Sequence, residues 1–213
     1  MKTVCIVPIK SNSKRIKGKN FRTVGKKPLY RYLLDKLNKT NFNEIYIDSD
    51  SEEIKNYCKK KGYKYIKRLK KLTKDNANGN DLLNYHAKII DADIYFQLFV
   101  TAPLLSSKTI NKCIRILKTK SNYDSIFTIK KIYSWFWFKK KPINYSPKIL
   151  PRSQDAEPII CETTGLYGIK KKSLKRLKAR IGKHPFMHEI SKKESLDIDD
   201  LEDLNYFKHI LKI

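Results

Sequence analysis

A cationic segment follows the first apolar run of the chain. Residues 4–9 form an apolar run of strand length, and residues 10–20 carry five cations among hydroxyl and amide side chains, namely Lys10, Lys14, Arg15, Lys17 and Lys19. A short apolar run is typical of a strand buried on both faces of a parallel sheet, and α/β sheets bind ligands at the carboxyl ends of their strands. We therefore expect an anion site here, with a polyphosphate as the best-fitting ligand. The alternative is a solvated lysine run in a lysine-rich chain.

A pair of carboxylates lies near the other end of the chain. Asp197 and Asp199 are separated by the apolar Ile198, and alternate side chains of an extended segment share a face. The two carboxylates can then hold one hard cation such as Mg²⁺. The alternative is a helix N-cap at Asp199 or Asp200, and both interpretations hold together if Asp200 is the cap.

Other polar residues in the chain could bind a ligand. Thr101 follows a predicted strand in which Gln97 shares a face with Phe99. The planar guanidinium of Arg152 matches a carboxylate, and Gly79 would allow close backbone approach to a ligand. The alternatives are an ordinary strand-to-helix turn at Thr101 and a solvated surface arginine at position 152.

The histidines do not indicate a metal site. His184 and His188 are four residues apart, but Pro185 argues against the helix on which that spacing would bring them together around zinc. His86 and His209 lie on predicted helices, and the sequence suggests no partner for either one.

The composition is that of a basic globular protein. At 213 residues and 40% hydrophobic content, the chain is long enough for one domain with a core. Its 47 Lys and Arg outnumber 21 Asp and Glu, which gives a net charge of +26. Because the lysines are scattered through every segment, we expect at most non-specific binding to nucleic acid.

The cysteines and the apolar runs bear on location. Cys5, Cys58, Cys113 and Cys161 form no CxxC pair, so we expect reduced core thiols in a reducing, cytoplasmic compartment. The first residues lead directly into a predicted strand, so a signal peptide is not expected. Since no apolar run reaches the ~18 residues of a membrane span, a membrane partner is not expected either.

Apolar periodicity predicts alternating strands and helices over most of the chain. Helices are expected at residues 28–41, 51–61, 81–90, 109–118 and 199–211. Further strands are expected at residues 44–47, 63–66, 94–100 and 124–129, with a return strand at 159–169. This alternation predicts an α/β fold, with a Rossmann-like, mostly parallel sheet and helices on both faces. We expect one domain over residues 1–213.

The alternation stops at residues 133–138, which are aromatic on both faces of a predicted strand. A strand that is apolar on both sides needs two coverings, and a partner subunit is a good candidate for the second. We therefore expect residues 132–157 to form a protruding β arm that mediates a homodimer.

Several segments resemble one family. Residues 7–20 resemble the signature loop of the acylneuraminate cytidylyltransferases, the CMP-sialic acid synthetases and their relatives, which has the form R-x-x-S-K-[GR]-[IL]-x-x-K-N after a strand. Lys10 stands where that loop has Arg, and the motif matches at Ser13, Lys14, Lys19 and Asn20. Residues 99–105, 151–167 and 197–204 resemble the family's Q-P-T-S-P-L-R motif, its P-R and E-T-G-G-x-Y motifs, and its D-I-D motif, with departures at Phe99 and Leu105.

The resemblance implies a fold of the nucleotide-diphospho-sugar transferase type and the transfer of CMP from CTP to a nonulosonic acid (sialic, legionaminic or pseudaminic), with release of pyrophosphate. It implies catalytic roles for Lys14, Lys19 and Asp199, and Mg²⁺ on Asp197 and Asp199. The nucleotide would contact Lys10, Ser13, Lys14, Asn20, Arg68, Asn78 and Gly79. The sugar acid would contact Gln97, Thr101, Arg152 and Tyr167, and Arg152 could act from a partner subunit.

Two other functions fit the sequence. One is a cytidylyltransferase for an eight-carbon acid or another nucleotide sugar. The other is a catalytically weakened basic protein that binds nucleic acid or an acidic surface, which the departures at Lys10, Phe99 and Leu105 would allow.

Overall fold

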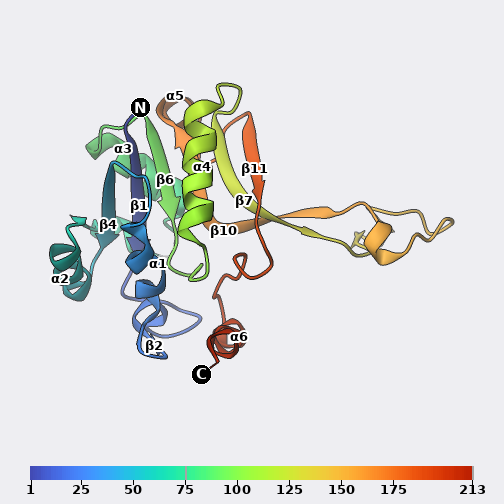
Figure 1. Cartoon of the computed structure of the whole chain (residues 1–213), viewed down its shortest axis with the longest axis horizontal. Helices are drawn as coiled ribbons and strands as arrows, with labels where there is room; N and C mark the ends of the chain where they lie inside the picture. The colour runs from blue at the N-terminus through green and yellow to red at the C-terminus, as the bar shows by residue number, and fades with distance from the viewer. Residues whose placement is uncertain (75, 213) are drawn as a thin grey trace.

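The centre of the structure, a computed structural model that describes residues 1–74 and 76–212, is a seven-stranded sheet (Figure 1). Its strand order is β11-β7-β10-β6-β1-β4-β5. The strands are β1 (Thr3–Ile9), β4 (Glu44–Ser49), β5 (Lys64–Lys67), β6 (Ile94–Leu98), β7 (Ser125–Ile132), β10 (Ile159–Lys170) and β11 (Pro185–Glu189). Strand β10 runs antiparallel to β6 and β7, and the other neighbouring pairs of this sheet are parallel. The predicted mostly parallel α/β sheet is therefore confirmed.

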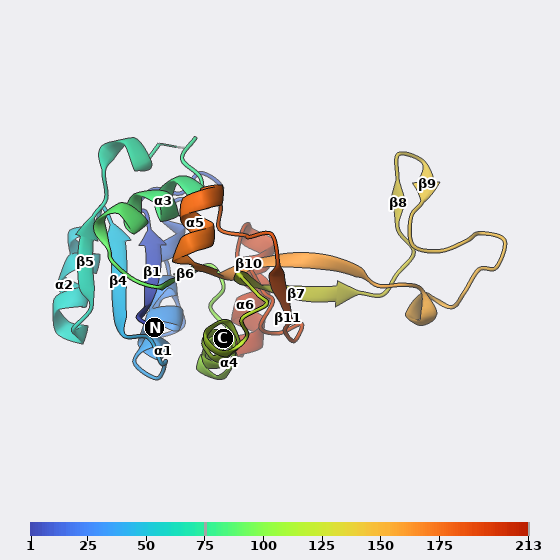
Figure 2. The same cartoon turned by 90° about the horizontal axis from the view of Figure 1, so that it is seen from above.

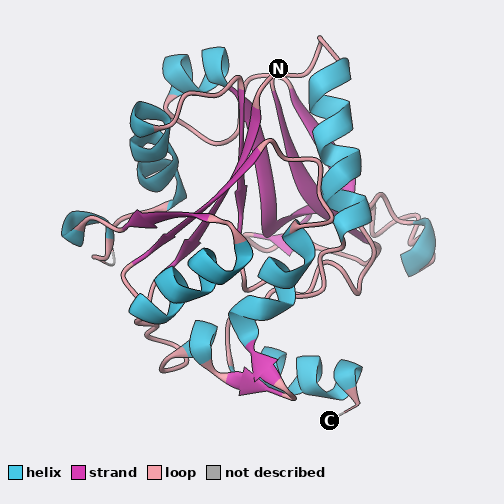
Figure 3. Cartoon of the chain, turned by 60° about the vertical axis from the view of Figure 1, so that its left-hand side comes forward, coloured by secondary structure: helices cyan, strands magenta, loops and turns pink. Residues whose placement is uncertain are grey.

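Helices cover both faces of the sheet, as the sequence predicts (Figures 2 and 3). One face packs against α1 (Leu29–Leu37), α2 (Glu52–Lys61) and α4 (Ser107–Thr119), and the other against α3 (Gly79–Ile89) and α5 (Lys171–Leu177). Every residue of β1 is buried, and its side chains alternate between these two cores. A strand with two covered faces needs apolar residues at both odd and even positions, which explains its continuous apolar run.

The last helix, α6 (Leu201–Leu211), lies beyond one end of the sheet and packs on segments that follow β1. Asp200 is its N-cap: the Asp200 side chain accepts a hydrogen bond from the Asp203 backbone nitrogen, and the Asp203 side chain accepts one from the Asp200 backbone nitrogen. This capping box satisfies backbone donors that a helix start leaves without partners. The predicted cap at Asp200 is confirmed.

Short elements join the larger ones. They are the 3-10 helices η1 (Lys19–Phe21), η2 (Lys70–Leu72) and η3 (Ser153–Asp155), a small ribbon of β2 (Thr23–Val24) with β3 (Lys27–Pro28), and a second ribbon of β8 (Trp137–Phe138) with β9 (Lys141–Pro142). Residues 68–80, which follow β5, contain η2 and the first residues of α3.

The first helix and strand β11 differ clearly from the sequence prediction. The first helix ends at Leu37 rather than near residue 41, because Lys39 and Thr40 turn back onto the carbonyls of Lys36 and Leu37. Strand β11 was not predicted: Pro185 served only as an argument against a helix at these residues. Proline is tolerated as the first residue of an edge strand, and Pro185 opens β11 at the edge of the sheet.

Residues 133–158 leave the sheet between β7 and β10 and form a long protrusion (Figures 1 and 2). Asn144 ties its strands together: its amide nitrogen donates to the carbonyls of Ser134 and Glu157, and its oxygen accepts from the Phe136 backbone. The strand expected over residues 133–138 is reduced to the two residues of β8. Away from the sheet, the aromatic side chains have no continuous neighbouring strand on which to pair, so the backbone there is mostly loop.

The cysteine prediction is confirmed in part. Cys5, Cys58 and Cys113 are buried free thiols, but Cys161 is only partly buried. Cys161 lies in the half of β10 that extends toward the arm, where less of the core covers it. Among the described helices, none is long and apolar enough to span a membrane. The cytoplasmic location stays a prediction.

Candidate functional site

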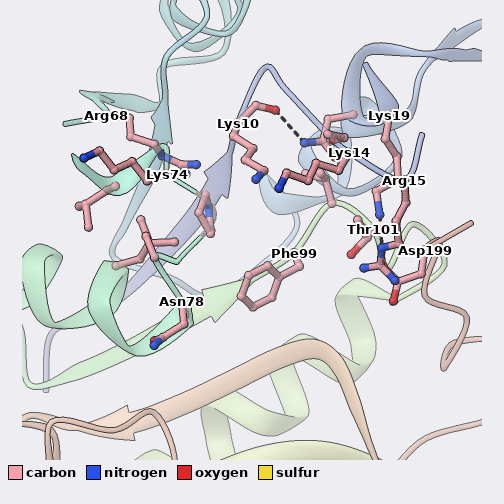
Figure 4. Close-up of a pocket in the computed structure, with 18 of the residues that line it drawn as sticks. Lys10, Lys14, Arg15, Lys19, Arg68, Lys74, Asn78, Phe99, Thr101 and Asp199 are labelled. Atoms are coloured by element: carbon pink, nitrogen blue, oxygen red, sulfur yellow. Dashed lines mark hydrogen bonds and ion pairs between the residues drawn. The ribbon is translucent and has the colours of Figure 1, made fainter. Parts of the chain in front are cut away.

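A cavity of about 390 Å³ opens at the carboxyl ends of β1, β5 and β6 (Figure 4). This is the edge at which open α/β sheets bind ligands, and its volume falls within the range of small-molecule sites. Ten of the predicted site residues line it: Lys10, Ser13, Lys14, Lys19, Asn20, Arg68, Asn78, Gly79, Thr101 and Asp199. The fold therefore brings together residues that are as much as 189 positions apart, from Lys10 to Asp199.

The cationic loop after β1 is closed at its base by Asn20. The Asn20 amide nitrogen donates to the carbonyl of Lys10 at 3.0 Å (Figure 4), and Gly18 makes the return turn with a left-handed φ of 63°. Ser11 fixes the first half of the loop, because its backbone nitrogen and its hydroxyl both donate to the Asp50 carboxylate. These contacts curl the loop, so that cations that are distant along it line one cavity.

Lys19 joins this loop to the segment before α6. Its buried ammonium donates to the Ile198 carbonyl at 2.5 Å and lies 3.3 Å from Asp199 Oδ1. The backbone nitrogen of Ile198 donates to the Thr101 carbonyl at 2.8 Å. The same carboxylate oxygen of Asp199 also accepts from Arg15 at 2.7 Å. Segments after β1, after β6 and before α6 are thus held in contact at one end of the cavity.

The charges around the cavity are strongly unbalanced. Seven of the described residues that line it are cationic, Lys10, Lys14, Arg15, Lys19, Arg68, Lys74 and Arg180, against one carboxylate, that of Asp199. Clustered cations in a partly enclosed cleft attract anions and raise their local concentration. The arrangement can bind a compact polyanion much better than a neutral ligand.

The start of α3 forms the opposite end of the cavity. Asn78 caps this helix: its side-chain oxygen accepts from the backbones of Asn80 and Asp81 at 2.8 and 3.1 Å. Because capping occupies that oxygen, the amide nitrogen is what Asn78 can offer to a ligand. Gly79 lies against Arg180, since a Cβ there would be 2.7 Å from Nη1 of Arg180.

Arg68 reaches the cavity from a buried polar cluster. Its Nε donates to Asp48 Oδ1 at 2.9 Å and its Nη2 to the Asp48 carbonyl at 3.1 Å. His86 Nε2 lies 2.6 Å from the other oxygen of Asp48. The sequence prediction of an isolated His86 is therefore wrong. The neighbouring strands β4 and β5 bring Asp48 and Arg68 together beneath α3, a proximity that no local sequence signal contains.

Four other predicted site residues lie outside the cavity lining: Gln97, Tyr167, Arg152 and Asp197. Gln97 is fully buried in β6 and donates to the Gly79 carbonyl at 3.0 Å. Tyr167 is also fully buried, its hydroxyl bonds Glu162, and burial raises the pKa of its phenol. Arg152 lies in the arm with a side chain 79% exposed and pairs with Asp155 at 3.0 Å.

Asp197 bears on whether a metal ion fits this site. One of its oxygens accepts from the Thr164 hydroxyl, and the other is buried with no hydrogen-bond partner among the described residues. The Ile198 side chain is buried in the cluster with Phe207, so the flanking carboxylates point away from that cluster. Two carboxylates with a free oxygen suit a hard cation that keeps several waters. No group of three or more metal-binding side chains occurs in residues 1–74 and 76–212.

Lys74, Phe99 and Arg180 also line the cavity, although none of them was predicted as a site residue. Phe99 appeared in the sequence as a departure from a family motif and Lys74 as one lysine among many. Arg180 follows α5, far from every motif, and no signal in the chain distinguishes it from the other 46 basic residues.

The comparisons with known proteins concern the whole chain. A family model described as cytidylyltransferase matches residues 4–177. An N-acylneuraminate cytidylyltransferase A of Danio rerio is 25% identical over 204 residues, which cover 91% of this chain and 47% of the relative. A pseudaminic acid cytidylyltransferase of Campylobacter jejuni is 26% identical over an alignment of 232 positions, covering 100% of this chain and 97% of the relative. The chain spans about half the length of several of these relatives, for example 53% of an N-acylneuraminate cytidylyltransferase of Streptococcus agalactiae.

Solved structures share the fold. A CMP:2-keto-3-deoxy-manno-octonic acid synthetase in complex with CTP superposes with a TM-score of 0.72, covers 100% of this chain and 99% of its own, and is 16% identical. A 4-diphosphocytidyl-2C-methyl-D-erythritol synthase from Anaerococcus prevotii gives 0.67 at 13% identity, covering 99% and 98%. At these identities the likeness concerns the fold.

The buried cluster beneath Arg68 leads to a stability prediction. Asp48→Ala is expected to lower the free energy of unfolding by about 3–5 kcal/mol, because it leaves a buried guanidinium without its carboxylate. Asp155→Ala is the matched control, since it breaks an exposed arginine–aspartate pair worth about 1 kcal/mol or less. Urea unfolding measures both. Equal losses in the two variants would contradict the assigned role of the cluster.

Proposed function

The chain belongs to the cytidylyltransferase family, and we propose that it transfers CMP from CTP to the anomeric hydroxyl of a nonulosonic acid of the sialic, legionaminic or pseudaminic type, with release of pyrophosphate. The observation that carries this proposal is the shared cavity. The cations of the loop after β1 and the Asp199 carboxylate face the same space, at the edge where a nucleotide would bind. The names of the relatives supply the class of acceptor.

The chemical difficulty of this reaction is electrostatic. A weak nucleophile, the anomeric hydroxyl, must reach an α-phosphorus that is surrounded by negative charge. In the proposed mechanism Lys10, Lys14 and Lys19 neutralise the triphosphate and the departing pyrophosphate, so that charge developing on the leaving group is stabilised where it forms. Lys19 is held at Asp199 and Ile198, so its ammonium is already oriented before the ligand binds.

We propose Mg²⁺ as the ion that Asp197 and Asp199 would hold. Bound there, it would polarise the α-phosphoryl oxygen or lower the pKa of the attacking hydroxyl. In this proposal, the burial of Ile198 and its backbone bond to Thr101 would keep the two carboxylates on one side of the segment. Arg15 and Lys19 balance the charge of Asp199 when no Mg²⁺ is bound.

The nucleoside is proposed to lie between the loop after β1 and the start of α3. Asn20, Arg68, Asn78 and Gly79 line that part of the cavity, and Ser13 lines the loop side. Arg68 is rigid because Asp48 binds it through two of its nitrogens. A fixed donor can read the edge of a nucleobase without a large entropic loss on binding.

The acceptor is proposed to bind on the Thr101 side. Gln97 and Tyr167 would support this side from beneath, since both are buried next to residues that line the cavity. Arg152 directly precedes η3 in the arm, which extends away from the sheet (Figure 2), and its side chain is 79% exposed. We propose that it reaches the acceptor of a partner subunit.

A homodimer through the arm is part of this proposal. The protrusion exposes large apolar side chains, among them Trp137 at 58%, Phe138 at 61% and Ile149 at 80%. Exposed apolar surface of this kind on a segment that leaves the core marks an interaction site. A second copy of the chain would cover it and would bring Arg152 to the neighbouring cavity.

The experiment that tests the function is incubation with CTP, Mg²⁺ and a panel of nonulosonic and eight-carbon sugar acids, followed by mass spectrometry of the products. The expected result is a CMP conjugate of a nonulosonic acid together with pyrophosphate. A conjugate of the eight-carbon acid alone would change the acceptor class. No conjugate at all, with nucleic-acid binding that weakens steeply with salt, would favour the basic binding protein instead.

Asp199→Ala is expected to abolish CMP transfer and to leave the fold intact, because the carboxylate is partly exposed and its removal should cost about 1 kcal/mol or less. Glu202→Ala, an exposed carboxylate in the first turn of α6, is the control and should retain activity. Initial rates and thermal unfolding of both variants provide the measurement. Unchanged turnover in Asp199→Ala would remove Asp199 from the mechanism.

The protein is expected to sediment as a dimer at micromolar concentration in analytical ultracentrifugation. Combining Trp137→Ser with Phe138→Ser should shift it to the monomer, because the arm would lose two of its large exposed apolar side chains. Leu201→Ser, which removes an exposed leucine on α6 outside the arm, serves as the control. A monomeric wild type would argue against the proposed role of the arm.

A further inference from the structure

We propose that Arg180 binds the carboxylate of the acceptor, a role that no motif in the sequence suggests. The inference rests on the proposed function, because it takes the acceptor to be a sugar acid. A sugar acid carries one planar anionic group, and a guanidinium fork matches a carboxylate through two parallel hydrogen bonds.

Arg180 lines the cavity with its side chain in a fixed orientation. The guanidinium lies 3.6 Å from the centre of the Tyr167 ring and 5.9 Å from that of Phe99. Its side chain is 25% exposed, so one part is packed on these rings and another is open to the cavity. Stacking on a buried tyrosine sets the plane of the fork before a ligand arrives.

The backbone around Arg180 is also held in place. Its nitrogen donates to the Asn80 side chain at 2.9 Å, and Asn84 donates to the carbonyl of Lys178 at 2.6 Å. On the other side, Gly182 donates to the Ser125 hydroxyl at 2.8 Å. Contacts to α3 and to β7 therefore fix both ends of a short segment, and a side chain on such a support loses little freedom on binding.

The fork has donors to spare for a ligand. Of the three arginines that line the described cavity, Arg15 and Arg68 have carboxylate partners at 2.7 and 2.9 Å. The corresponding partner of Arg180 is Glu162, at 3.5 Å, and that same oxygen also accepts from the Tyr167 hydroxyl. An arginine has five N–H donors, so one long contact leaves most of them available.

The position of Arg180 separates it from the cations proposed for the triphosphate. Its Nη1 lies next to Gly79, whose missing Cβ makes room for it, and its plane faces Phe99. Lys19 and Asp199 lie on the other side of Phe99 from Asn78 (Figure 4). Arg180 therefore lies at the α3 end of the cavity, over the Tyr167 ring that is proposed to support the acceptor, and away from Lys19 and Asp199, where pyrophosphate would leave.

The test compares the acid with its methyl ester as acceptor in wild type and in Arg180→Ala. Wild type is expected to show a KM for the acid about 10- to 150-fold lower than for the ester, the range of a charge-assisted contact. Arg180→Ala should raise the KM for the acid by a similar factor, leave the KM for CTP unchanged, and abolish the preference for acid over ester. Arg180→Lys, which keeps the charge without the fork, should give an intermediate KM.

Arg176→Ala is the control, because it removes an exposed arginine of α5 outside the cavity and should change neither KM. A purely structural role for Arg180 would lower the melting temperature and leave the acid-to-ester ratio intact, and that result would overturn the proposal. A rise in the KM for CTP alone would assign Arg180 to the nucleotide and overturn it too. If the preference survives in Arg180→Ala and disappears in Arg152→Ala, the partner's arginine is the clamp and the inference fails. A wild type that makes no CMP conjugate would fail the proposed function itself, and this inference with it.

Discussion

Ile198 joins the segment before α6 to the loop after β1 and to the segment after β6. Its backbone nitrogen donates to Thr101, its carbonyl accepts from Lys19, and its side chain is fully buried with Phe207 and Ile16. Both hydrogen bonds join residues that are about a hundred or more positions apart, so forming them costs loop-closure entropy that burial must offset. Without this junction Asp199 would not face the loop after β1, and the cavity would lose its carboxylate.

The distribution of charge around the cavity differs from that over the whole chain. The net charge of +26 is spread over the whole chain, whereas the cavity concentrates seven cations around one carboxylate. Several of these cations are held in place by specific contacts: Arg68 by Asp48, Arg15 and Lys19 by Asp199, and Arg180 by the Tyr167 ring. Fixed donors need little reorganisation when an anion binds, which is the property that electrostatic catalysis requires.

Much of the fold could be predicted because its signals are local. Continuous apolar runs predicted the buried strands, and 3.6-residue periodicity predicted every longer helix but not the seven-residue α5. Gly62 ends α2 in the expected left-handed conformation. The elements that were predicted wrongly depend on contacts between segments that are distant in the sequence. Strand β11 depends on the pairing of Pro185–Glu189 with β7, and the aromatic arm lacks the neighbouring strands that its apolar pattern suggested.

The sequence by itself determined the order of elements, the cationic loop, the acidic pair around Ile198 and the membership of a family, because each depends on residues that are adjacent or nearly so. Only the tertiary structure decided which side chains share a cavity. It paired His86 and Arg68 through Asp48, placed Gln97 and Tyr167 behind the lining, left Arg152 on the arm, and set Arg180 at the site. The physical reason is that such contacts depend on which strands are neighbours in the sheet and on how loops close at its edge, and these are properties of the packed chain rather than of any short segment.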